Sequence, residues 1–270
     1  MTTAALRPKA PAVFWALGVL SILSLRAGPA AAIPDSAFTG YARDIGSGRL
    51  LYTEAHLVQD AGSASESRVV LYKCPRGDSA FARKRLTYTA MREDPQFAFE
   101  DARLGYIEGL RTVGGVREVY QRPDAAAPLR KRVVPQGVAV VSDAGFDEFV
   151  KKHWDELEQG KTVRFPFLVP SRLDYMTFKV KKHHETPIEG APASVIRLNL
   201  SGLLGFFLPY IEVSYRKSDR VLMRYKGLVN IRDEAGDNLT AQIDFPARER
   251  GAATSDLAAV MNVPLLRRCP

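Results

Sequence analysis

Short runs of strand-forming residues recur along most of the chain, and they constrain its fold more than any other sequence feature. In residues 239–245, LTAQIDF, apolar and polar side chains alternate, which predicts a strand with one buried and one exposed face. Clusters rich in Gly, Pro, Asp and Ser separate the runs, as turns require. We predict strands at residues 50–58, 68–74, 81–89, 96–100, 104–113, 116–122, 129–134, 138–141, 162–169, 175–182, 194–200, 211–217, 220–228 and 239–245.

One helix is predicted, over residues 144–159. Phe146, Phe149 and Trp154 recur there at helical spacing, and Gly160 follows as a typical helix end. Strands and helices do not alternate, which argues against a parallel sheet. The predicted fold class is mainly β or α+β: a strongly curved antiparallel sheet or open β-barrel with one main helix, forming a single domain over residues 33–246.

The two ends of the chain differ in character from this domain. Residues 1–32 have the layout of a secretory signal peptide, with basic residues, an apolar stretch and small residues up to Ala32. We expect cleavage after Ala32 and a periplasmic location; an uncleaved anchor is the alternative. Residues 247–270 have a basic, small-residue start and no long period, so we expect a loose C-terminal tail.

The basic charge of the chain is less informative than it first looks. Lys and Arg exceed Asp and Glu by 38 to 30, a formal +8. Loss of residues 1–32 removes three basic residues and no acidic one, which leaves +5. The remaining clusters, such as residues 83–85 and 179–182, are short, whereas nucleic-acid binding needs a continuous basic face. We therefore expect no nucleic-acid partner; an anionic envelope surface is the alternative to a merely solvated surface.

The two cysteines, Cys74 and Cys269, have two possible states. In an oxidising compartment they can pair and tether the tail to the body of the protein. Two free thiols are the other possibility.

Recognisable catalytic motifs are absent from the sequence. It contains no nucleophile elbow, phosphate-binding loop, Cys-x-x-Cys or His-Glu-x-x-His. We expect no enzyme activity and no cofactor or metal.

Four histidines are the candidates for acid–base or metal chemistry. Glu54 and His56 share one face of a predicted strand, where a carboxylate and an imidazole can exchange a proton; this supports an alternative hypothesis, an envelope hydrolase. His183 and His184 are adjacent, and neighbours on a regular strand point to opposite faces, which argues against a metal site.

An apolar segment, LLGFFLP at residues 203–209, shows neither strand alternation nor a polar face. Such a segment is either buried as a plug within a curved sheet or used to contact an apolar ligand, a membrane or a partner.

The export signal, the antiparallel strands and this insertion together resemble the periplasmic lipoprotein-carrier architecture of Gram-negative bacteria. The stretches LYTEAH (residues 51–56), FPFLVP (165–170) and RYKGLVNI (224–231) are similar to those of uncharacterised exported proteobacterial proteins. The resemblance implies an unclosed β-barrel around an apolar cavity lidded by helices, and it transfers no functional residue.

The preferred hypothesis is a soluble, monomeric periplasmic protein that binds a lipid-like ligand or an envelope partner. The residues expected to line its cavity are Phe146, Phe149, Trp154, Leu203, Leu204, Phe206 and Phe207. The alternatives are the hydrolase and a structural or interaction protein with a filled core. An outer-membrane barrel is disfavoured because residues 82–86 place charges on both faces of a strand.

Overall fold

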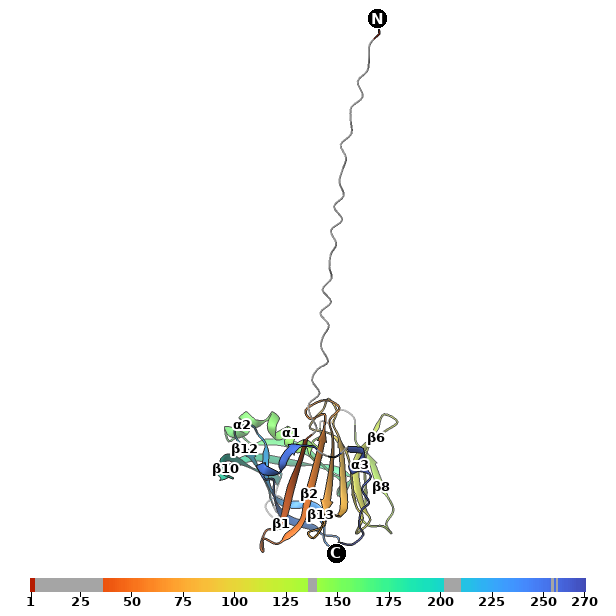
Figure 1. Ribbon diagram of the computed structural model, residues 1–270, viewed down its shortest axis with the longest axis vertical. Coiled ribbons are helices and arrows are strands. Elements are labelled where there is room, and N and C mark those ends of the chain that lie inside the picture. The colour runs from red at the N-terminus through yellow and green to blue at the C-terminus, as the bar shows by residue number, and fades with distance from the viewer. Residues whose placement is uncertain (3–35, 136–139, 202–209, 254, 256) are drawn as a thin grey trace. The chain divides into compact units, whose positions relative to one another are not determined.

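The computed structural model describes residues 1–2, 36–135, 140–201, 210–253, 255 and 257–270 (Figure 1). The chain separates into two units, Met1–Ala32 and Ile33–Pro270, and the described strands and helices belong to the second. These strands all form one antiparallel sheet, which is not closed into a complete barrel. The predicted fold class is thereby confirmed. Among the described residues, no helix has the length and apolar composition needed to cross a membrane.

The elements have the following bounds. The strands are β1 Ser36–Asp44, β2 Leu50–Gln59, β3 Ser67–Lys73, β4 Ala80–Thr87, β5 Gln96–Asp101, β6 Tyr106–Val113, β7 Val116–Arg122, β8 Arg130–Val133, β9 Val163–Val169, β10 Asp174–Ile188, β11 Ala191–Leu200, β12 Ile211–Arg216, β13 Leu222–Arg232, β14 Asn238–Asp244 and β15 Arg250–Ala252. The helices are α1 Gly145–Lys152, α2 Trp154–Glu158 and α3 Leu257–Met261, with short 3-10 turns at Pro170–Arg172 and Ala247–Glu249.

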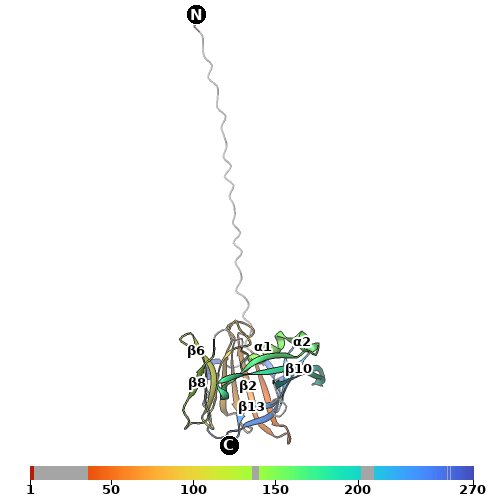
Figure 2. The same ribbon diagram turned by 180° about the vertical axis from the view of Figure 1, so that it is seen from behind.

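Almost every strand pairs with its neighbours in the sequence. The exceptions are β8 and β9, which do not pair with each other, and β1, which pairs with β14 and with the short β15 and so joins the start of the strand run to its end. Register shifts in several ladders insert extra residues, which bend a sheet and increase its twist. As a result β10 runs across the direction of β2 (Figure 2). The sequence pattern did not predict β1, because small and polar residues interrupt its apolar alternation, SAFTGYARD.

The sheet is open between its two edge strands, β8 and β9, and Val140 and Val141 connect the two sides of the opening. Val141 forms an isolated parallel bridge with Phe167 of β9, and Leu168 donates a backbone hydrogen bond of 2.9 Å to Val141. Val140 and Leu168 are buried in one apolar cluster with residues of β4 to β7. The two sides of the opening therefore share a core without sharing a ladder.

The predicted helix over residues 144–159 is divided into α1 and α2. The division is at His153, whose φ of −97° and ψ of 16° lie outside the helical region, and whose Nδ1 lies 2.8 Å from Oε1 of Glu156. Gly160 follows α2 with a φ of +76°, which glycine adopts without steric strain. The apolar side of both helices packs on strands β9 to β12.

The C-terminal segment differs from the loose tail expected from the sequence. Its apolar residues pack against Val69 and Leu71 on the outer side of β3, and the amide of Leu266 donates a 2.8 Å hydrogen bond to the carbonyl of Ala80. Arg83 Nη1 donates to the carbonyl of Val263 at 3.0 Å. Apart from the short helix α3, these residues cover the sheet as irregular chain without a regular period, so sequence patterning could not reveal their burial.

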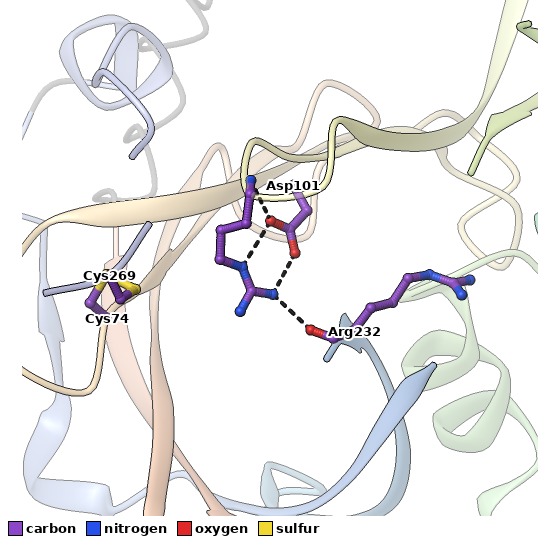
Figure 3. Close-up of a disulfide and its surroundings, with 5 residues drawn as sticks. Cys74, Asp101, Arg232 and Cys269 are labelled. Atoms are coloured by element: carbon purple, nitrogen blue, oxygen red, sulfur yellow. Dashed lines mark hydrogen bonds and ion pairs between the residues drawn. A yellow bond between two sulfur atoms is a disulfide. The ribbon is translucent and has the colours of Figure 1, made fainter. Parts of the chain in front are cut away.

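Cys74 and Cys269 form a disulfide that fastens this segment to the end of β3, with a Cα separation of 5.5 Å (Figure 3). Nearby, Arg103 Nη2 donates to Oδ2 of Asp101 at 2.6 Å and to the carbonyl of Arg232 at 2.9 Å. The bridge joins residues 195 positions apart.

Replacement of both cysteines, Cys74→Ser with Cys269→Ser, should lower the free energy of unfolding by roughly 3 to 5 kcal/mol, because the unfolded chain regains the entropy that a long covalent loop removes. Urea unfolding of the oxidised protein and of the double variant measures the difference. Addition of a reductant should destabilise the wild type and leave the variant unchanged. Equal stability of the two proteins would contradict the expectation.

Gly40 of β1 lies where a side chain has no room. A Cβ at this position would come within 2.5 Å of the buried Phe245 ring. Gly40→Ala should therefore cost about 1–3 kcal/mol of unfolding free energy through overpacking. Gly46→Ala is the matched control, since the nearest atom to its Cβ would be 3.6 Å away. Thermal or urea unfolding compares the two variants, and an equal effect of both would refute the steric argument.

Candidate functional site

The predicted aromatic ligand-binding residues that are described lie together, packed on the sheet. The Phe149 ring centroid is 4.2 Å from that of Phe165, and Trp154 meets Tyr215 edge-on at 6.1 Å. Phe146 stacks on Phe165 at 5.9 Å and is only partly buried. Their apolar surface is thus largely used in the core. The other four predicted residues, Leu203, Leu204, Phe206 and Phe207, lie outside the described residues.

Glu54 and His56 are brought together on the inward face of β2. His56 Nε2 lies 2.9 Å from Oε2 of Glu54, and the imidazole stacks on Phe38 with a centroid distance of 4.2 Å. An ionised carboxylate only accepts hydrogen bonds, so Nε2 is the donor. Burial lowers the pKa of His56, against the opposing effect of Glu54. The carboxylate–imidazole geometry that the hydrolase hypothesis requires is present, and the catalytic role stays a prediction.

Further charged groups share this inward face, although nothing in the sequence pattern connects them. Lys84 Nζ of β4 donates to Oδ2 of Asp143 at 2.7 Å. Burial alone would lower the pKa of Lys84, but the attraction of Asp143 raises it above its usual value. On β6, Glu108 accepts hydrogen bonds from Tyr106 at 2.5 Å and from Asn230 at 2.9 Å, and burial raises its pKa.

These inward charges are arranged as partnered groups. Each ionic or hydrogen-bonded pair satisfies polar atoms that would otherwise be costly to bury. The Lys84–Asp143 pair also joins the sheet to the residue that precedes α1 by two positions. The charges therefore contribute to holding the helical segment on the sheet.

A different arrangement occurs on the opposite face of β9, β10 and β11, where a hollow of about 260 Å³ is lined by polar and basic residues. No carboxylate is among the residues that line it. We call it the basic groove; its lining residues are Thr162, Arg164, Lys179, Lys181, Lys182, His183, Arg197 and Asn199.

Strand register places like charges opposite each other in the basic groove. Lys179 of β10 is paired in register with Arg164 of β9, and Lys181 is paired with Arg197 of β11. Directly opposed like charges destabilise a sheet. Arg197 is compensated by Glu212, whose Oε1 lies 2.8 Å from Nη2. Within the described part of the chain, Arg164 and Lys181 have no ion-pair partner.

His183 lines this groove and His184 is the next residue of the chain, and their arrangement corrects the sequence interpretation. The β10–β11 register shifts between Lys182 and His184, so His183 is the extra residue of a β-bulge. A bulge breaks the regular alternation of side chains. Both histidines are exposed, and their Nδ1 atoms are 2.7 Å apart. The argument that adjacent strand residues must diverge was therefore wrong at this position.

His56 should make stability depend on pH. Because its folded-state pKa is lowered, the unfolded chain takes up a proton first as pH falls, so this contribution is present above the ordinary histidine pKa of about 6.5 and is lost below it. His56→Gln should remove that part of the dependence. Urea unfolding at pH 7.5, 6 and 5 compares the wild type, His56→Gln and the control His153→Gln. If the unfolding free energy of His56→Gln depended on pH as steeply as that of the wild type, His56 would not be the source of this pH dependence.

Comparisons with known proteins do not identify the chain. No protein-family model matches it, and no curated protein matches it. Among solved structures, the chain is similar to the crystal structure of a beta-barrel-like protein, of a domain of unknown function called DUF1849, from Brucella abortus. That match has a TM-score of 0.48 and 9% sequence identity, and it covers 82% of this chain and 98% of the other. At this level of similarity it carries no functional argument.

Proposed function

We propose that the chain is a monomeric binding protein of the bacterial cell envelope, exported to the periplasm, whose basic groove holds the anionic headgroup of an envelope lipid. The observation that carries this proposal is the groove itself, lined by basic residues from three adjacent strands without a carboxylate. Lysine and arginine both bind phosphate groups, and arginine does so through two parallel hydrogen bonds.

The energetics of the sheet favour an anion at this place. Two cross-strand pairs place like charges opposite each other, an arrangement that is unfavourable in itself, although Glu212 offsets part of the repulsion at Arg197. A bound phosphate between them would turn this repulsion into charge-assisted hydrogen bonds. Such an arrangement is more informative than net charge, since most surface charges on a folded protein are interspersed with charges of opposite sign.

The order of residues along the chain also suits a lipid. Arg197 and Asn199 of the groove are followed, a few residues later in the sequence, by the apolar segment at residues 203–208. Basic residues provide contacts for a headgroup, and apolar residues provide contacts for acyl chains.

The packed aromatic residues on α1 and α2 favour a second candidate function, a structural or interaction protein with a filled core.

Neutralising two groove residues, Arg164→Gln with Lys181→Gln, should weaken binding to anionic vesicles. At about 1 kcal/mol for each basic residue near a charged membrane surface, the expected loss is about 30-fold. Cosedimentation with phosphatidylglycerol vesicles measures it, with phosphatidylcholine vesicles as the neutral comparison.

The matched control is Arg76→Gln with Arg130→Gln. These two arginines are exposed, lie outside the basic groove, and change the net charge by the same amount. The control should bind almost as well as the wild type. Equal losses of vesicle binding in both double variants would show a general charge effect. If the wild-type protein did not bind anionic vesicles, the lipid proposal would be refuted.

A further inference from the structure

The β-bulge in β10 gathers three side chains with metal-binding atoms. His183 Nδ1 is 2.7 Å from His184 Nδ1 and 3.6 Å from Oε1 of Glu212 on β12. One nitrogen or oxygen from each residue falls within 4.8 Å of the others. The bulge in β10 and the position of Glu212 on β12, across β11, produce this grouping.

We propose that His183, His184 and Glu212 form a binding site for a divalent transition-metal ion of the zinc type. Two imidazoles and one carboxylate are a ligand set that zinc accepts, with a water molecule as fourth ligand. At metal–ligand distances of 2.0–2.1 Å, tetrahedral ligands are about 3.3 Å from one another. The observed separations bracket this value, so side-chain movements of less than about 1.5 Å would complete the geometry.

The surroundings of the three residues permit this coordination. Both histidines are exposed, which leaves room for an ion and its water. Arg197 donates to Oε1 of Glu212 at 2.8 and 3.1 Å. Its Nη2 also lies 3.3 Å from His183 Nδ1, and the guanidinium must give up this contact when His183 binds a metal. Oε2 has no hydrogen-bond partner among the described residues. A metal can therefore use Oε2, once the carboxylate has rotated to turn this oxygen instead of Oε1 toward the histidines. Arg197 can keep its contact with Oε1 and hold the carboxylate in position, as outer-sphere partners do.

This inference does not rest on the proposed lipid function. His183 also lines the basic groove, but His184 and Glu212 do not, and the groove variants leave all three ligands unchanged, so the two proposals can fail separately.

Isothermal titration of the untagged full chain with zinc chloride tests the site. The wild type should bind one equivalent. His184→Ala should bind at least tenfold more weakly, and the double variant His183→Ala with His184→Ala should show no saturable binding. Glu185→Gln is the control, because that neighbouring carboxylate is already held by Lys182 and Lys217 and should leave zinc affinity unchanged.

A second measurement needs no variant. Zinc should shift the imidazole NMR signals of His183 and His184 and leave those of His153 in place. The proposal would be overturned if the wild type showed no one-to-one binding, or if zinc shifted the signals of His153 alone. It would also be overturned if His184→Ala kept the wild-type affinity, or if Glu185→Gln lost as much affinity as His184→Ala.

Discussion

The ladder between β1 and β14 is the contact on which the rest of this fold depends. Apart from the short β15, which pairs with β1, all other pairings join sequence neighbours, so without this ladder the longer strands would form two separate meanders, β1–β8 and β9–β14. The pairing requires close approach: Gly40 lies under the Phe245 ring, and Ala42 faces Ile243 in register. Once the two meanders are joined, the sheet curves far enough for α1, α2 and the residues that directly precede α1 to fill its open side.

The opening between β8 and β9 shows how an incomplete barrel avoids two problems of free sheet edges. Edge strands expose unpaired backbone groups and invite association with other chains. β8 is short and carries Arg130, Lys131 and Arg132, while β9 contains Pro166, which lacks an amide hydrogen. The apolar cluster that crosses the opening adds stability without a ladder, and charged pairs on the inward face add connections between the sheet and the segment before α1.

The basic groove and the bulged histidines have a common origin in the register of β10. Residues 174–180 of β10 pair with β9 and residues 178–188 pair with β11, so the two ladders overlap only around Lys179. Before the bulge this brings basic residues together, and at the bulge it brings two imidazoles to one face. The same strand therefore supports two different chemical proposals within a short distance along the chain.

Local patterning was sufficient to predict the strand-rich antiparallel fold, the turns and the helical region, because alternation of period two and helical spacing are properties of consecutive residues. The Glu54–His56 pair was predictable for the same reason. Long-range contacts decided the rest: which distant strands pair, where the C-terminal segment packs, that Cys74 reaches Cys269, and which charges face one another. The histidine cluster depends on a single extra residue in one strand, and that register is set only when β10 pairs with β11.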